Sequence, residues 1–314
     1  MSATKYPRQV VVDDTDVRIQ YSGSGWFPTQ TQGTLDTIGT FGVFGPPFQH
    51  TSHRTASNGT ISYSYKGRKS ETVCSHSLMR MLGSTISVYG TTDIHNISGV
   101  LDPTWECFLD GQSLEVNMTS FLLSNGHNNI VLCQANSSVA SDSDHELVVK
   151  IASSGSTLWF DNFLYTPPAT IPITQETLRV DDSDAGIVYS HGWAAWGETA
   201  TWSLVPTATM TFEFIGEHPI DRDFEVYLKT FIKTGRSISW VGMVPTTNKD
   251  APFNATYSID NGDPVSFLVN DPSQPSKSNQ YFFYHSRITS LLPLVTGVAQ
   301  WCIGWFDTRL SYNW

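Results

Sequence analysis

Polar and apolar residues alternate along many short segments of this chain, which is the pattern of half-buried β-strands. Residues 60–65 read Thr-Ile-Ser-Tyr-Ser-Tyr, and residues 147–151 place Leu, Val and Ile at the same period of two. Asp110 and Asn261 are each followed by glycine, and such dipeptides favour hairpin turns because they tolerate positive φ. Helical spacing is scarce. We therefore predict an all-β protein.

A longer pattern occurs twice in the chain. Val-Asp-Asp-Thr-Asp at 12–16 returns as Val-Asp-Asp-Ser-Asp at 180–184, and an Ile-x-Tyr-Ser segment follows both copies. Three further pairs keep the same order: 86–90 with 238–242, 108–111 with 258–262, and 159–161 with 305–307. Chance is a poor explanation for four ordered matches, so we expect an internal duplication.

The duplication predicts two tandem β-sandwich domains. We place the first at 1–168 and the second at 169–314, because the proline-containing segment 166–172 has the composition of a stiff, extended connector. Residues 217–235 have no counterpart in the first copy. They form an expected insertion whose spacing fits a strand as well as a helix.

Charge and hydropathy exclude several partners. The 314 residues carry a net charge of −11, and their lysines and arginines are scattered. A nucleic-acid partner requires a basic stripe, so we expect none, and an anionic membrane would be repelled. No run of about 18 uncharged apolar residues predicts a membrane span.

Sequons indicate synthesis in the secretory pathway. Asn-x-Ser/Thr is the acceptor motif for N-glycosylation and belongs to secreted chains. We expect a signal peptide to have preceded residue 1, and a secreted or vacuolar location. The five candidate acceptors are Asn58, Asn96, Asn117, Asn136 and Asn254.

Four cysteines fit the same compartment. They contain no Cys-x-x-Cys pair, so a structural zinc site is not expected. Cys107 and Cys133 lie in one repeat on either side of a hairpin, and we predict a disulfide between them that bridges neighbouring strands. Cys74 and Cys302 belong to different repeats. They either staple the repeats together or stay free.

The paired aspartates allow two interpretations. Asp13-Asp14-x-Asp16 and Asp181-Asp182-x-Asp184 resemble clusters of calcium ligands. The spacing is not that of an EF-hand loop, and aspartates at the start of a strand more often cap turns. We expect no metal and no cofactor. Motifs for phosphate loops, nucleophile elbows and zinc proteases are also missing from the sequence.

Aromatic residues in glycine-rich loops are the remaining candidates for a site. Trp26 and Trp193 follow the first strands of the two repeats, with Trp196 close behind, and residues 281–285 read Tyr-Phe-Phe-Tyr-His. These rings pack on edge strands or form an apolar pocket for a flat ligand or a sugar ring.

The motif order resembles that of extracellular tandem β-sandwich proteins of filamentous fungi, which have galactose-binding-like jelly-roll domains. That order is Val-Asp-Asp, Tyr-Ser, Ile-Ser-Val-Tyr-Gly, Cys-Phe-Leu-Asp-Gly, a second Cys, and Trp-Phe-Asp-x-x-x-Tyr. The resemblance covers nearly the whole chain, although the second repeat lacks the cysteines. Among such proteins the chain looks like the hetero-Diels–Alderases that join a tropolone quinone methide to a humulene-type sesquiterpene.

The resemblance implies a cofactor-free cycloaddition of hydrophobic small molecules, catalysed by orientation, hydrogen bonding and exclusion of water. The expected hydrogen-bond donors are His191, Arg236 and Tyr284. The expected pocket walls are Trp193, Trp196, Trp26, Trp240 and Phe283.

The alternative is a secreted glycan-binding or cell-surface recognition protein, because tryptophans on sandwich loops commonly stack on sugar rings. A glycosidase is a third possibility, but it needs two facing carboxylates that the sequence cannot place. A closed apolar chamber would favour the cycloaddition, and open aromatic faces flanked by polar groups would favour glycan binding.

Overall fold

The chain packs as two compact units in a computed structural model. The first unit comprises residues 10–171, and the second comprises residues 172–314 together with residues 1–9. The predicted division fell between residues 168 and 169. The structure describes residues 8–32, 34–35, 45–66, 84–116, 126–139, 144–167, 176–196, 200–203, 205, 207–213, 237–243, 253–269, 280–286, 294–298 and 303–308.

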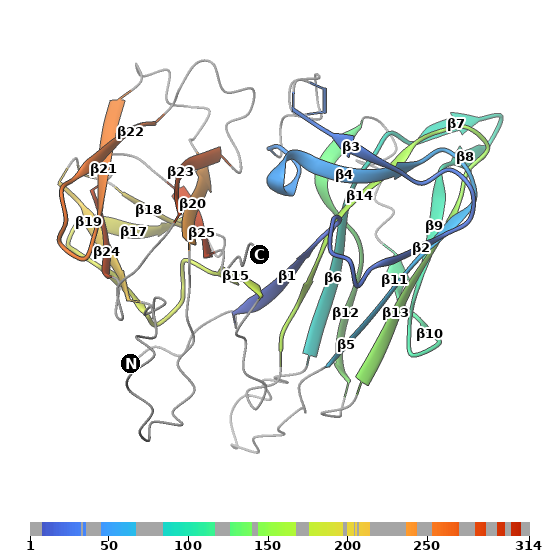
Figure 1. Cartoon of the computed structure of the whole chain (residues 1–314), viewed down its shortest axis with the longest axis horizontal. Coiled ribbons are helices and arrows are strands. Elements are labelled where there is room, and N and C mark those ends of the chain that lie inside the picture. The colour runs from blue at the N-terminus through green and yellow to red at the C-terminus, as the bar shows by residue number, and fades with distance from the viewer. Residues whose placement is uncertain are drawn as a thin grey trace, which may run out of the picture. The chain divides into compact units, whose positions relative to one another are not determined.

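The first unit is built from two antiparallel sheets and a short hairpin (Figure 1). Sheet I contains β1 (Gln9–Asp13), β3 (Phe27–Gln30), β4 (Thr51–Thr55), β6 (Ser84–Thr92), β11 (Glu115–Val116), β12 (His127–Val139) and β14 (Leu158–Tyr165). Sheet II contains β2 (Gln20–Ser22), β5 (Gly59–Lys66), β9 (Thr104–Leu109), β10 (Gln112–Ser113) and β13 (Asp144–Ala152). The hairpin is β7 (His95–Ile97) with β8 (Val100–Asp102), and a 3-10 turn, η2 (Phe48–His50), precedes β4.

Burial alternates along the strands of sheet II, as the sequence pattern predicts. In β13 every second residue from His145 to Ile151 is buried, and the residues between them are exposed or half-buried. The apolar side chains therefore face one way, toward sheet I, where Tyr63 of β5 meets Phe163 of β14 at 5.5 Å between ring centroids. The indole of Trp105 also crosses between the sheets, donating to the Leu132 carbonyl over 2.9 Å. This unit is a β-sandwich.

A disulfide joins Cys107 of β9 to Cys133 of β12, which confirms the predicted pair. Both cysteines are fully buried. The expectation that they bridge neighbouring strands is wrong, because β9 belongs to sheet II and β12 to sheet I. The bond therefore fastens the two layers of the sandwich to each other.

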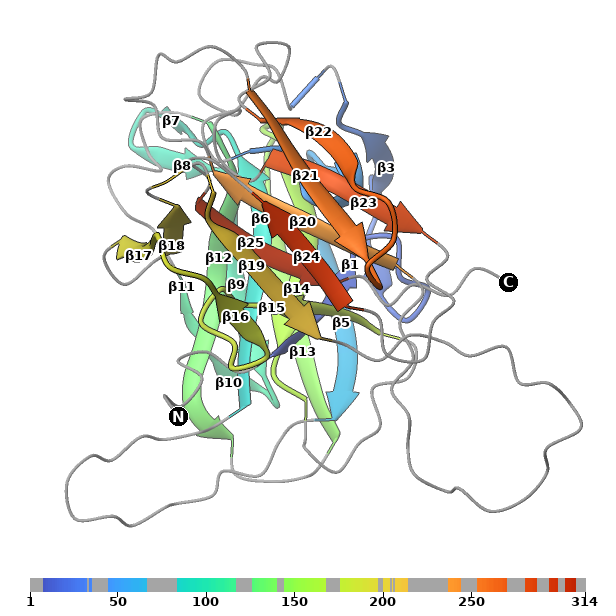
Figure 2. The ribbon, with the colours of Figure 1, turned by 90° about the vertical axis from the view of Figure 1, so that its left-hand side faces the viewer.

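The second unit also has two antiparallel sheets (Figure 2). Sheet III contains β15 (Thr177–Val180), β17 (Trp193–Trp196), β18 (Ala200–Ser203), β20 (Ser237–Met243), β23 (Gln280–Ser286) and β25 (Ile303–Thr308). Sheet IV contains β16 (Ile187–Tyr189), β19 (Thr209–Glu213), β21 (Phe253–Ile259), β22 (Val265–Val269) and β24 (Leu294–Val298). The expected insertion at 217–235 lies outside the described residues.

An apolar core fills this second sandwich. Trp240 of β20 is 1% exposed and meets Phe267 of β22 edge-on at 5.9 Å between ring centroids. Met210 and Phe212 of β19 and Ile238 of β20 are buried in the same cluster. Side chains from sheets III and IV thus share one interior. The all-β prediction is confirmed in both units.

The two units have the same strand topology. The five strands of sheet II can be numbered first to fifth by their order along the chain. Across the sheet they then lie in the order first, second, fifth, third, fourth (β2-β5-β13-β9-β10), and the strands of sheet IV lie in the same order (β16-β19-β24-β21-β22). In sheet I, β14 pairs with β1, β4 and β6, and in sheet III, β25 pairs with β15, β18 and β20. This correspondence supports the proposed internal duplication.

Within the described part of the chain, no helix has the length and apolar character that a membrane crossing requires.

Candidate functional site

An open groove of about 420 Å³ lies at the end of the first unit where β5 stops and β13 starts. These strands run side by side in Figure 1. The volume falls in the range of small-ligand sites. The groove is lined by Arg18, Tyr63, Ser64, Tyr65, Lys66, Asp144, Tyr165 and Pro167.

Three tyrosines form the floor of this groove. Tyr63 and Tyr65 point the same way from β5, with their rings nearly parallel and their centroids 6.4 Å apart. Tyr165 of β14 closes the floor, 4.8 Å from the ring of Tyr65. All three are at least 93% buried, since their exposed fractions are 2%, 5% and 7%. The floor is therefore firmly packed, but it offers little surface, and the rim must supply most of the contacts with a ligand.

Arg18 lines the groove over Tyr63 and is held in place. Its guanidinium lies over the ring of Tyr63, 5.6 Å from the centroid. The guanidinium also donates two hydrogen bonds to Asp16, from Nε to Oδ1 over 2.9 Å and from Nη2 to Oδ2 over 2.6 Å. Burial raises the pKa of Asp16, but the hydrogen bonds from Arg18 outweigh it and hold that pKa below its usual value.

Lys66 and Asp144 also line the groove and form its charged rim together with Arg18. They are directly opposite each other on β5 and β13, at the last position of that ladder. The Lys66 Nζ is 4.0 Å from the Asp144 Oδ1, and the side chains are 64% and 80% exposed. The rim thus presents an ammonium and a carboxylate side by side in water.

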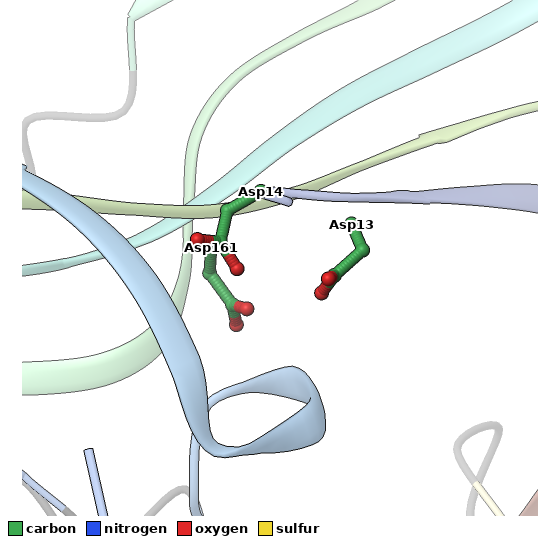
Figure 3. A group of neighbouring side chains, drawn as sticks. All are labelled: Asp13, Asp14 and Asp161. Atoms are coloured by element: carbon green, nitrogen blue, oxygen red, sulfur yellow. The ribbon is translucent and has the colours of Figure 1, made fainter. Parts of the chain in front are cut away.

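A separate cluster of carboxylates lies where β1 ends beside β14 in the first unit (Figure 3). Asp13 ends β1, Asp14 follows it, and Asp161 belongs to β14, so the pairing of these strands brings the groups together. One carboxylate oxygen from each residue lies within 4.8 Å of the others. Asp14 and Asp161 are each only 1% exposed. Oxygens so placed could hold a proton or a hard cation.

Protein groups already satisfy much of this cluster. The Thr51 hydroxyl donates to Asp14 Oδ1 over 2.6 Å, and His53 Nδ1 lies 2.7 Å from Asp14 Oδ2. The Phe48 N–H lies 3.0 and 3.1 Å from the two oxygens of Asp161. Burial, together with the negative charges of Asp13 and Asp14, raises the pKa of Asp161 well above its usual value.

The paired aspartates cap turns in both units. Asp13 Oδ2 accepts a hydrogen bond from the Thr15 N–H over 3.4 Å, and Asp181 Oδ1 accepts one from the Ser183 N–H over 3.0 Å. Turn capping was the simpler of the two sequence interpretations. It accounts for the recurrence of aspartate at these positions.

A tyrosine closes each of these turns in the same way. The Tyr21 hydroxyl donates to the Asp14 carbonyl over 2.7 Å, and the Tyr189 hydroxyl donates to the Asp182 carbonyl over 2.8 Å. In the second unit, burial raises the pKa of Asp182 to about 6, against an opposing hydrogen bond from Thr201. That carboxyl therefore titrates near neutral pH.

Two expected wall residues pack against the closing tyrosines. The Trp26 indole donates to the Ser22 carbonyl over 3.1 Å and lies 5.1 Å from the Tyr21 ring, tilted by 52°. The Trp193 indole donates to the Thr209 carbonyl over 2.9 Å and lies 5.1 Å from the Tyr189 ring, tilted by 53°. Both indoles are half-buried.

Gly59 shows how closely Trp26 is packed. A Cβ on Gly59 would come within 2.6 Å of the indole Nε1, so the indole lies directly on this glycine.

The other expected residues are dispersed. Trp240 lies in the core of the second unit, and His191 is exposed in the turn before β17. Arg236 lies outside the described residues. Trp196, Phe283 and Tyr284 are placed on strands β17 and β23, without a description of their side chains. The described residues bring none of these groups into the groove.

Three expected acceptor asparagines are exposed: Asn58, Asn96 and Asn254. Asn96 lies in the β7–β8 hairpin, and its Oδ1 accepts the Gly99 N–H over 2.8 Å. Asn136 is on β12 without a described side chain. Asn117, Cys74 and Cys302 lie outside the described residues.

Sequence reasoning did not find the groove. Lys66 and Asp144 are ordinary charged residues in the sequence, and only the antiparallel pairing of β5 with β13 makes them neighbours. The acidic cluster had a fainter signal, since Asp161 belongs to the repeated Trp-Phe-Asp motif. Compared with known proteins, the chain matches no family model and no curated protein.

Proposed function

We propose that the protein is an extracellular glycan-binding recognition protein and that the groove of the first unit is its binding site. The groove itself carries this proposal. It is open, its floor is aromatic, and its rim offers both hydrogen-bond donors and an acceptor. Sugars carry many hydroxyls, which both donate and accept, so they match the polar rim, and their apolar C–H faces match the small aromatic surface that the floor exposes.

The extracellular location rests on two features. The buried disulfide between sheets I and II is of a kind that forms and persists in oxidising compartments. The exposed sequons at Asn58, Asn96 and Asn254 are accessible for glycosylation.

A steric block tests the groove. Ser64 is exposed and lines the groove, and its side chain is on the face of β5 opposite to the buried Tyr63 and Tyr65, so Ser64→Trp should add bulk at the rim without touching the buried floor. Ser62→Trp is the matched control, because Ser62 lies two residues earlier on the same face of β5 and does not line the groove. Binding of the full chain is measured by calorimetry against soluble glucans, mannans and xylans.

We expect Ser64→Trp to abolish binding and Ser62→Trp to preserve it. The proposal is overturned if the wild-type chain binds no polysaccharide in the panel, or if Ser64→Trp binds as well as wild type.

Cycloaddition remains a second candidate because the accessible lining of the groove is more apolar than polar, although the groove is open and not a closed chamber. It predicts that the protein changes the stereochemical ratio of adducts formed from a tropolone quinone methide and a humulene-type alkene. An unchanged ratio, compared with the spontaneous reaction, would remove this candidate.

A further inference from the structure

We propose that Lys66 and Asp144 together recognise a vicinal diol, so that the groove selects sugars with two free hydroxyls on adjacent carbons. This inference rests on the proposed glycan-binding function and names the chemistry of its ligand. It follows from the spacing, exposure and partners of the two residues.

Lys66 and Asp144 are too far apart to form a hydrogen bond with each other. A separation of 4.0 Å is too long for a hydrogen bond, so the ammonium keeps its three donors and the carboxylate its lone pairs. Among the described residues, neither side chain has a further partner. In contrast, Arg18, which also lines the groove, is engaged by Asp16.

The arrangement matches adjacent hydroxyls better than isolated ones. Two neighbouring hydroxyls of a pyranose can accept from an ammonium with one oxygen and donate to a carboxylate with the other. Lys66 and Asp144 supply these complementary groups from facing positions on paired strands, which fixes their backbones relative to each other. Hydrogen bonds to charged groups are the stronger ones in proteins.

The net charge of the pair supports a neutral sugar. The ammonium of Lys66 and the carboxylate of Asp144 cancel in charge, as do the guanidinium of Arg18 and its partner Asp16. An anionic sugar would place its carboxylate near Asp144 at a cost, and a cationic one would meet Lys66. A neutral glycan with free adjacent hydroxyls avoids both costs.

Linkage chemistry provides the test. Internal residues of 1,4-linked and 1,6-linked hexose polymers keep adjacent free hydroxyls, whereas those of a linear 1,3-linked glucan do not. We expect the full chain to bind soluble 1,4-linked or 1,6-linked polymers and to bind a long 1,3-linked glucan at least about tenfold more weakly. Periodate cleaves vicinal diols, so oxidation and reduction of the bound polymer should abolish binding.

Variants tie the selectivity to the pair. Lys66→Gln and Asp144→Asn should each weaken binding about tenfold, the loss expected for one charged hydrogen bond. Lys66→Arg should keep most of the affinity because the donor remains. The matched controls are Lys150→Gln and Glu106→Gln, an exposed cross-strand pair of the same sheet, which should bind as wild type.

The outcomes separate this inference from the proposed function. If binding is blocked by Ser64→Trp yet survives periodate treatment or both pair substitutions, the groove binds glycans but does not read a diol, and the inference is overturned. If no polymer is bound at all, the glycan-binding proposal fails and this inference fails with it.

Discussion

The two units share a topology but differ in how their layers are joined. In the first unit, Cys107 of β9 is bonded to the facing sheet. The corresponding position of β21 in the second unit is Tyr257, which is 6% exposed and lies 6.2 Å from Phe267 of the neighbouring strand β22, between ring centroids. Phe267 in turn meets Trp240 of the facing sheet III at 5.9 Å between ring centroids. The described layers of the first unit are thus joined by a covalent bond in addition to aromatic packing, and those of the second unit by aromatic packing. The strand order tolerates either solution, because both put apolar volume at the same place.

The turns after β1 and β15 show a second difference. Asp16 accepts hydrogen bonds from Arg18 of the same turn. Asp184 instead accepts them from Arg8, whose Nε lies 2.8 Å from Asp184 Oδ2. The hydrogen bond to Asp184 raises the pKa of Arg8, so this arginine remains charged. Asp16 and Asp184 occupy equivalent positions, but the arginine that pairs with each comes from a different part of the chain.

The largest expected effect concerns the aromatic core of the second unit. Trp240→Ala should destabilise the second unit by about 3–5 kcal/mol, because it removes a large buried ring and leaves a cavity. Urea unfolding of the full chain, with hydrogen exchange to assign the transition, measures the change. Val265→Ala, at an exposed position of the same unit, should cost less than about 0.5 kcal/mol. Equal effects would show that Trp240 is not a core residue.

The next effect concerns the covalent link. Replacing Cys107 and Cys133 together with alanine should lower the stability of the first unit by about 3 kcal/mol, since the bond closes a loop with a sequence separation of 26. Transitions of the second unit should not move. A shift of both units by the same amount would contradict the assignment of the bond to one sandwich.

A smaller loss of stability, equal in the two units, is expected at the turns that Tyr21 and Tyr189 close. Tyr21→Phe and Tyr189→Phe each remove one hydrogen bond to a backbone carbonyl, and each should cost about 1 kcal/mol in its own unit. Denaturation midpoints of the two single variants provide the measurement. Clearly unequal losses would break the structural equivalence of the two turns.

The last expected effect is a dependence of stability on pH. The pKa of Asp182 in the folded state is about 6, above its usual value of 3.8. A raised carboxyl pKa favours folding at low pH, and this contribution is lost as the pH rises through 6. The second unit should therefore lose some stability between pH 4 and pH 7, and Asp182→Asn should flatten that slope. An unchanged slope in this variant would assign the pH dependence to another group.

Strand patterning and cysteine placement were predictable from local sequence. Alternation in β5 and β13 follows from one buried face per strand, and glycine after Asp110 marks a turn that needs positive φ, as found at both residues. The disulfide partners were also correct. Which layers they join was not, because a hairpin in the sequence does not reveal which strands pair and which face each other.

The groove could not be predicted for the same reason. Its lining comes from β5, β13, β14 and the turn at Arg18, and no local pattern marks residues so far apart as neighbours. The tryptophans attracted attention by their chemistry alone. Trp240 illustrates the difficulty, since a core indole and a pocket indole have the same local sequence signal.

The two ends of β5 have different environments. Lys66 stands at the groove end, and Asn58, whose Oδ1 accepts the Ser153 N–H, immediately precedes the other end. At about 3.3 Å per residue the strand separates them by roughly 25 Å. An oligosaccharide attached to Asn58 would therefore begin a strand's length away from the groove. Glycosylation at Asn58 alone should therefore leave the access of a ligand to the groove unchanged.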